Sequence, residues 1–272
     1  ALLALVANAW AVTEPAQVTM TSRVAEPPTP NVMLTIDDSG SMLADFMPEG
    51  SFTINGGTVN LANAWIGAFP ADWRKLCTSG VPGCVTGTWP TGNYLEGVAT
   101  SVKSGNAYQM QYRSPDVNKI FYNPDLVYLP WYKSDGSGNR MPNSVLSAAR
   151  YDPVVSSGTF NLSKNYTGGS AITTVWYTGP GSKKTEGKDF YPGLVYRLNP
   201  GKSPTSTANF TRYDILATDG THAPATKHPN RTDCKGAKCT LAEEQQNFAN
   251  WFTYYRMRES LTKAAVSESF VL

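Results

Sequence analysis

The feature that most constrains the fold is a short apolar run that ends abruptly in carboxylates and hydroxyls, NVMLTIDDSGSM, residues 31–42. Residues 32–36 carry almost no polarity, and Asp37 follows at once. An apolar run of this length without alternation favours a strand buried on both faces, as in a parallel sheet covered by helices. One strand cannot make a parallel sheet. The sequence therefore predicts an α/β fold of which this chain holds only part, with the remaining strands beyond Leu272.

Three oxygen-bearing side chains, Asp37, Ser39 and Ser41, alternate at the end of this run. In a loop that leaves a sheet, alternate side chains can converge on one point, and the carboxyl end of a parallel strand is where open α/β sheets bind ligands. One carboxylate and two hydroxyls suit a hard divalent cation such as Mg²⁺, Mn²⁺ or Ca²⁺. An open coordination position on that cation could accept a carboxylate from a partner. A turn capped by these side chains is the alternative.

With the apolar run before it, this motif resembles the metal-ion-dependent adhesion site of von Willebrand factor A domains. The resemblance implies that Asp37, Ser39 and Ser41 are first-strand ligands, and that later loops supply a threonine and a second aspartate. We expect those loops to lie outside this chain, so that cation binding here is weak or absent. Asp219, in ILATDG, precedes the final helix and is interpreted as a turn residue. Residues 135–139, DGSGN, are also interpreted as a turn, because the closing glutamate of a calcium loop is missing.

The N-terminal part of the chain is interpreted as targeting and linker sequence. Residues 1–11, ALLALVANAWA, look like the remnant of a secretory signal peptide, with a buried helix as the alternative. Residues 12–30 form a linker that ends in EPPTP, which favours extended backbone. Residues 31–41 follow as the first strand and metal-site loop of the A-type domain.

Residues 42–240 consist of short aromatic and β-branched bursts separated by turn signals, which predicts a β-rich meander. A structureless connection of this length is implausible, so the segment is interpreted as an inserted domain. The candidate strands lie at residues 121–132, 171–177, 193–198 and 210–216.

Residues 241–272 contain helix formers and neither glycine nor proline. Thr240 followed by Glu243 is a capping-box pattern, and Phe248, Phe252 and Tyr255 fall on one side of a helix. We expect one long helix from 241 to about 270, the truncated helix of the A-type domain. The predicted fold class is thus an incomplete von Willebrand factor A-like, Rossmann-type domain, with its first strand and first helix interrupted by a large β-rich insertion.

The four cysteines form two close pairs, Cys77 with Cys84 and Cys234 with Cys239. Three connectivities are possible, and local pairing in an oxidising compartment is the simplest. The second pair lies near His222, His228 and Asp233, which raises a zinc site as an alternative. The spacing of these residues lacks the paired knuckles of structural zinc sites.

Two further stretches, residues 119–131 (KIFYNPDLVYLPW) and 231–260 (from RTDCKGAKC to YYRMRES), resemble the PilY family of bacterial type IV pilus biogenesis and tip-adhesin proteins. The resemblance implies export to the periplasm, outer surface or pilus tip of a Gram-negative bacterium. It also implies association with minor pilins and attachment to a host or surface ligand. We expect no catalytic activity, and no transmembrane span because the apolar run at residues 1–11 is too short. The net charge of +2, without a dense basic run, gives no indication of nucleic-acid binding.

Two alternatives remain open. The β-rich segment could carry a secreted carbohydrate-active or glycan-binding function, with a groove lined by tryptophans: Trp65, Trp73, Trp89, Trp131 and Trp176. Its carboxylates show no recognisable paired arrangement for glycoside hydrolysis. Asparagines in N-x-S/T sequons suggest a eukaryotic secreted glycoprotein instead, although such matches are common in a chain this rich in Ser, Thr and Asn: Asn161, Asn165, Asn209 and Asn230.

Overall fold

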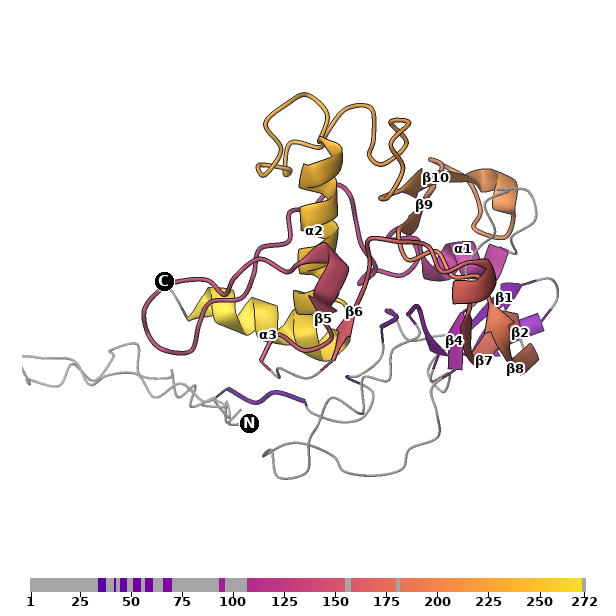
Figure 1. Ribbon diagram of the computed structural model, residues 1–272, viewed down its shortest axis with the longest axis horizontal. Helices are drawn as coiled ribbons and strands as arrows, with labels where there is room; N and C mark the ends of the chain where they lie inside the picture. The colour runs from indigo at the N-terminus through magenta and orange to yellow at the C-terminus, as the bar shows by residue number, and fades with distance from the viewer. Residues whose placement is uncertain are drawn as a thin grey trace, which may run out of the picture. The chain divides into compact units, whose positions relative to one another are not determined.

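The computed structural model describes residues 34–37, 42, 45–47, 51–54, 57–60, 66–69, 93–95, 107–154, 158–179 and 182–270 (Figure 1). The chain divides into two units, Ala1–Ile36 and Asp37–Leu272, and every helix and strand of the described residues lies in the second. The predicted signal remnant and linker, residues 1–30, lie outside the described residues.

The described part of the second unit is a mixed α/β structure with small sheets. Its strands are β1 (Ser51–Ile54), β2 (Gly57–Asn60), β3 (Ile66–Gly67), β4 (Asn93–Leu95), β5 (Ala149–Arg150), β6 (Thr159–Phe160), β7 (Ile172–Gly179), β8 (Ser182–Lys188), β9 (Leu194–Leu198) and β10 (Phe210–Asp214). One sheet has four strands in the order β3-β4-β7-β8, and three further sheets are two-stranded.

The strand order differs from a simple meander. β7 and β8 form an antiparallel hairpin from Ile172↔Lys188 onward, and β9 and β10 form another. In contrast, β4 lies parallel to both β3 and β7, so the chain crosses over between them. Three of the four candidate strands, at 171–177, 193–198 and 210–216, are confirmed by β7, β9 and β10.

The fourth candidate strand, residues 121–132, is wrong: apart from a bridge at Tyr132, this segment is irregular. Side chains of the C-terminal region take the hydrogen bonds that a neighbouring strand would otherwise supply. Asn247 accepts a bond from Tyr128 N at 2.7 Å and donates one to Leu126 O at 2.8 Å. Tyr255 Oη donates to Leu129 O at 2.6 Å. With these backbone groups already satisfied, the segment has no need of a sheet.

Among the described residues the helices are α1 (Ala107–Tyr112), α2 (Leu241–Tyr254) and α3 (Arg258–Ser269). Short 3₁₀ turns include η2 (Leu146–Ala148), η3 (Gly168–Ser170) and η4 (Thr207–Asn209). The capping box predicted at the start of α2 is present: Thr240 Oγ1 accepts from Glu243 N at 3.3 Å, and Glu243 Oε2 accepts from Thr240 N at 2.8 Å.

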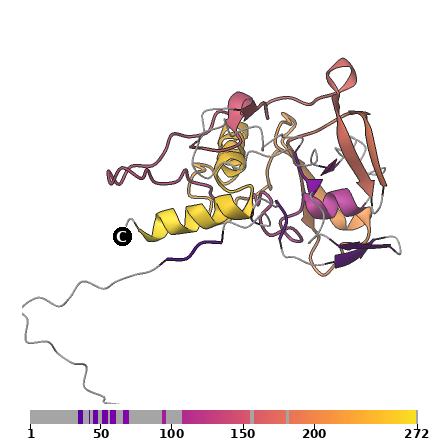
Figure 2. The same cartoon turned by 90° about the horizontal axis from the view of Figure 1, so that it is seen from below.

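The single helix predicted for residues 241–270 is corrected to two helices that run in different directions (Figures 1 and 2). Tyr255 has φ −136° and ψ −8°, and Met257 has φ −107° and ψ 159°. No glycine or proline causes this break. Instead, Trp131 Nε1 donates to Tyr254 O at 2.9 Å, an acceptor that a continuous helix would use internally. The guanidinium of Arg256, buried at the break, lies over the Phe252 ring at 4.1 Å. Tertiary contacts therefore override local helix propensity.

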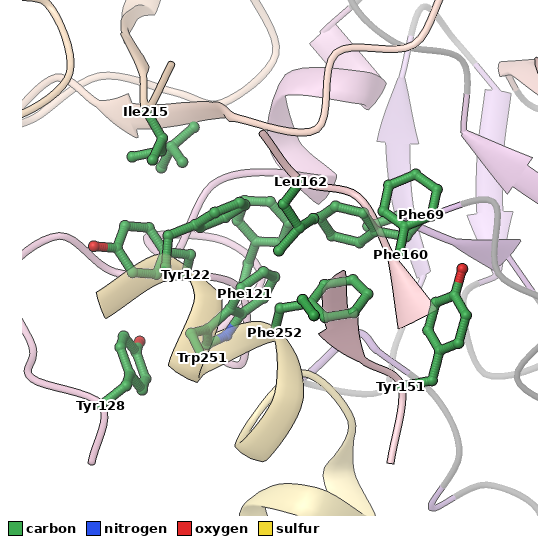
Figure 3. Packing of buried hydrophobic residues seen from close by; sticks show 14 of the residues in the cluster. Phe69, Phe121, Tyr122, Tyr128, Tyr151, Phe160, Leu162, Ile215, Trp251 and Phe252 are labelled. Carbon is green, nitrogen blue, oxygen red and sulfur yellow. The ribbon is translucent and has the colours of Figure 1, made fainter. Parts of the chain in front are cut away.

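The core is strongly aromatic and is centred on the buried face of α2 (Figure 3). Phe248, Trp251 and Phe252 of α2 meet rings from earlier segments, among them Phe69 and Tyr122. Phe69 and Phe252, for example, lie edge to face with centroids 5.0 Å apart. α2 and the segments before it contribute side chains to this one core. The predicted boundary between an inserted domain and the final helix stays a prediction.

Candidate functional site

The predicted metal motif is only partly covered by the described residues. Asp37 is described and exposed, whereas Ser39 and Ser41 lie outside the described residues. The apolar run before them forms no strand at residues 34–37, and Leu34 and Ile36 are 51% and 41% exposed. The strand predicted to be buried on both faces is therefore not found at these residues, because no neighbouring strand pairs with them. The three residues stay candidate metal ligands, and the A-type domain stays a prediction.

The chain that follows the motif is firmly anchored at Asp45. Its carboxylate is buried and accepts a hydrogen bond from Tyr112 Oη at 2.5 Å and one from Ala68 N at 2.7 Å. Burial raises the pKa of Asp45 above its usual value, while these hydrogen bonds and the charge of Arg256 act in the opposite direction. Asp45 thus attaches the chain after the motif to α1 and to Ala68, the residue after β3.

The two residues after Asp45 are also held by long-range hydrogen bonds. Arg258, at the start of α3, donates to Phe46 O from Nε at 2.9 Å and from Nη2 at 2.6 Å. Asn118 donates to Asp45 O at 2.8 Å and accepts from Met47 N at 3.0 Å. Residues 45–47 are therefore a fixed attachment point, eight residues beyond Asp37 in the chain.

A second cluster joins the two stretches that carry the PilY resemblance. Glu244, in the first turn of α2, accepts hydrogen bonds from Arg231 Nη1 at 2.6 Å and from Tyr122 Oη at 2.5 Å. Arg231 and Glu244 are both 0% exposed. Arg231 also forms two bonds to the Asp233 carboxylate, at 2.8 and 2.9 Å, and one to Pro124 O at 2.7 Å.

The electrostatics of this cluster follow from burial and mutual compensation. Burial raises the pKa of Glu244, and the charge of Arg231 opposes that effect. Burial lowers the pKa of Arg231, but hydrogen bonds to Asp233 and Glu244 and the charge of Glu244 outweigh burial and raise it. Both carboxylate oxygens of Glu244 accept hydrogen bonds, as expected of an ionised group. The cluster is a satisfied structural network rather than an open site.

The cysteine segment supports the same end of α2. Cys234 and Cys239 form a disulfide with a Cα–Cα distance of 5.0 Å, and both are buried. This bridge uses the two thiols that the zinc alternative requires, and His222 Nε2 lies 3.0 Å from Cys239 O. Within the described ranges, no group of three or more His, Cys, Asp or Glu side chains could hold a metal ion. Cys77 and Cys84 lie outside the described residues.

The two turns interpreted from the sequence are turns in the structure. Asp219 Oδ1 accepts hydrogen bonds from Thr221 N at 2.9 Å and from Thr221 Oγ1 at 2.6 Å. Asp135 Oδ1 accepts from Ser137 N at 3.0 Å, and Gly136 follows with φ 70°, a backbone region that favours glycine. The hydrogen bonds lower the pKa values of both carboxyl groups.

The tryptophans of the proposed glycan groove are not assembled in the described residues. Trp131 is buried, packs against Tyr254 and uses its indole nitrogen within the fold. Trp65, Trp73 and Trp89 lie outside the described residues, and only the backbone of Trp176 is described, in β7. Trp131 therefore serves the core.

Sequence reasoning missed the Arg231–Glu244 pair. A signal for it exists, because Glu244 precedes Phe248 by four residues and Trp251 by seven, on the helix side that the aromatic residues occupy. A carboxylate in such a position requires a buried partner. The sequence alone does not indicate that Arg231 supplies it, since the intervening disulfide loop determines where Arg231 lies.

Comparison with known proteins gives two similar relatives. The chain is 25% identical over 246 residues to the type IV pilus biogenesis factor PilY1 of Pseudomonas aeruginosa strain UCBPP-PA14, covering 89% of this chain and 14% of that protein. It is 24% identical over 251 residues to the same factor of strain PAK, covering 89% of this chain and 15% of that protein. These similarities confirm the resemblance to the PilY family that the sequence predicts: the chain is a relative of type IV pilus biogenesis factors.

The chain spans about one seventh of the length of the relatives it matches. No family model matches it. No solved structure matches it either. The A-type domain is therefore predicted from the sequence motif and is not supported by a similar structure. Among the described helices, none is both long and apolar enough to cross a membrane.

Proposed function

We propose that this chain is part of an exported, type IV pilus-associated protein that acts in pilus biogenesis and attachment and has no catalytic activity of its own. The observation that carries this proposal is the similarity to PilY1 along 89% of the chain. The two stretches that carry the resemblance also contact each other in the structure, through Tyr122 and Glu244. The similarity covers most of the chain rather than a short motif.

The proposal extends to partners and location. We propose that the full-length protein reaches the outer surface or pilus tip of a Gram-negative bacterium and contacts minor pilins there. A divalent cation at Asp37, Ser39 and Ser41, completed by loops outside this chain, would present an open position to a carboxylate of a host or surface ligand. The anchoring of residues 45–47 supports this role, because a ligand-gripping loop needs a fixed attachment to its scaffold.

Genetics tests the pilus role. Deleting the gene for the full-length protein should reduce the number of surface pili and pilus-dependent surface motility, and expression of the wild-type protein should restore both. Fractionation should place the protein outside the cytoplasm and in sheared pilus preparations. Normal piliation and motility in the deletion strain would contradict the proposal.

The metal role has a separate test with a matched control. Calorimetric titration of the full-length protein with Mg²⁺ or Mn²⁺ should show binding that Asp37→Ala abolishes. Asp135→Ala, which removes an exposed aspartate from the 135–139 turn, should leave binding unchanged. Equal affinity in wild type and Asp37→Ala would remove Asp37 from the ligand set without affecting the pilus role.

The alternative of a carbohydrate-active protein is not favoured by any contact among the described residues. Turnover of polysaccharides by the purified protein would overturn the non-catalytic proposal.

A further inference from the structure

The disulfide loop, residues 231–239, is tied to α2 at its far end. Thr240, the residue after Cys239, caps α2, and Glu243 accepts hydrogen bonds from both Thr240 N at 2.8 Å and Lys235 N at 3.1 Å. One carboxylate thus holds the loop and the helix cap together. The Cys234–Cys239 bridge closes a ring that contains Lys235 and ends one residue before Thr240.

At its near end, the disulfide loop supplies Arg231. The backbone there turns tightly, with Cys234 N donating to Arg231 O at 3.4 Å. The Arg231 side chain donates to Asp233 within the loop, and also to Glu244 of α2 and to Pro124 O. Its position in the loop therefore determines whether the buried Glu244 carboxylate has a cationic partner.

The other side of this contact is the aromatic segment, residues 119–131. Tyr122 donates to Glu244, Pro124 accepts from Arg231, and Asn247 Nδ2 donates to Tyr122 Oη at 3.1 Å. The aromatic segment lacks a partner strand. These side-chain bonds attach it to α2, together with the packing of Phe121 and Tyr122 in the core. Arg231 and Glu244 together connect three parts of the chain that are distant in sequence.

We propose that the Cys234–Cys239 disulfide is a redox-dependent lock on this junction, which keeps the aromatic segment attached to α2 by holding Arg231 beside Glu244. Opening the bridge frees the chain between the two cysteines and adds conformational freedom to the disulfide loop. If the Arg231 side chain then moves away from Glu244, the Glu244 carboxylate becomes a buried charge without a partner. A buried unpaired charge generally destabilises the folded state by several kcal/mol. The favourable response is for the first turn of α2 and the aromatic segment to separate and admit water.

The redox step is a thiol–disulfide exchange. Closure forms the Cys234–Cys239 S–S bond while two electrons and two protons pass to a disulfide of an exchange partner, which becomes a dithiol. Opening is the reverse, with a dithiol as the reductant. Both sulfurs belong to buried residues, 2% and 4% exposed. A dithiol therefore reaches the bridge only when the disulfide loop opens locally.

Hydrogen exchange read by mass spectrometry on the full-length exported protein tests this lock. In Cys234→Ala/Cys239→Ala, amides of residues 119–131 and 241–247 should exchange at least tenfold faster than in wild type. Amides of β9 and β10 should keep their wild-type rates. Cys77→Ala/Cys84→Ala, the matched removal of the other close cysteine pair, should leave the 119–131 and 241–247 peptides unchanged.

A second background isolates the role of the ion pair. In Arg231→Met/Glu244→Leu, which replaces the buried charges by apolar side chains, removing Cys234 and Cys239 should accelerate exchange in the same peptides less than twofold. Equal acceleration in both backgrounds would overturn the proposal, because the bridge would then act independently of Arg231. Acceleration that includes β9 and β10 would overturn it as well, since the bridge would stabilise the whole chain rather than the junction.

Discussion

Arg231 Nη1 donates to Glu244 Oε2 across 2.6 Å, and neither side chain has any exposed surface. The two residues lie on either side of the N-terminus of α2 in the sequence. Arg231 precedes the Cys234–Cys239 disulfide, and Glu244 follows the helix cap at Thr240. The pair is fully hydrogen-bonded, by Asp233 and Pro124 O on one side and by Tyr122 on the other. Such a pair is costly to break, because either partner alone is a buried charge.

Glu244→Gln should destabilise the protein by about 3–5 kcal/mol, the usual effect of removing one partner of a buried ion pair. Glutamine can still accept a hydrogen bond, so the loss isolates the charge that compensates Arg231. Urea denaturation followed by tryptophan fluorescence measures the difference. Arg231→Met/Glu244→Leu should lose less than Glu244→Gln alone, because no unpaired charge remains.

The matched control is an exposed pair, Arg140 and Glu268, which are joined at 2.6 Å with side chains 25% and 47% exposed. Glu268→Gln should cost less than about 1 kcal/mol, since water and ions screen exposed pairs. If Glu268→Gln and Glu244→Gln prove equally damaging, burial is not the reason for the importance of the Arg231 pair.

Local sequence signals predicted local structure well. The aromatic and β-branched bursts at residues 171–177, 193–198 and 210–216 form β7, β9 and β10, and the capping box at Thr240 is present. Burial of Phe248 and Phe252 on one side of α2 followed from their helical spacing. In each case the residues that determine the element lie within it.

Features set by distant residues were not predictable in the same way. The composition of the aromatic segment predicts a strand. Its backbone instead forms hydrogen bonds with side chains such as that of Asn247, which lies more than a hundred residues later in the chain. The break between α2 and α3 has no local cause, because Trp131 competes for Tyr254 O. For the metal motif, only Asp37 of its three predicted ligands is described, so that prediction stays open.

Asp45 should make stability depend on pH in a defined direction. Burial raises its pKa in the folded state, so the folded protein holds a proton to higher pH than the unfolded chain does. The stabilising contribution of Asp45 is fully present at pH values below its pKa in the unfolded chain, about 3.9. It declines as the pH rises through the higher pKa of Asp45 in the folded protein. Relative to Asp45→Asn, the wild type should therefore lose stability as pH rises above the unfolded pKa of about 3.9.

Urea denaturation of both proteins at a series of pH values measures this difference, and carboxylates common to both cancel in the comparison. A wild type that gains stability over Asp45→Asn as pH rises would show that Tyr112, Ala68 N and Arg256 outweigh burial.

Trp251 should be one of the most damaging positions in the core. It is 1% exposed, contacts Phe121 with ring centroids 5.0 Å apart, and donates from Nε1 to Ile120 O at 2.9 Å. Trp251→Ala should cost about 3–5 kcal/mol through lost burial and the resulting cavity. Trp251→Phe should cost less and report mainly the lost hydrogen bond. Val154→Ala, at a side chain 71% exposed, is the control and should stay within about 0.5 kcal/mol of wild type.

Thr240 joins the disulfide loop to α2, so its cap should contribute both to stability and to local order. Thr240→Ala removes the acceptor for Glu243 N and should cost about 1 kcal/mol, whereas Thr240→Ser keeps the hydroxyl and should cost much less. Thermal denaturation ranks the stabilities of wild type, Thr240→Ser and Thr240→Ala. Hydrogen exchange at residues 241–244 shows where in α2 the lost stability is felt. Faster exchange in Thr240→Ala should be confined to this first turn, because Trp251 and Phe252 hold the rest of α2 in the core. Uniform acceleration along α2 would show instead that the cap controls the whole helix.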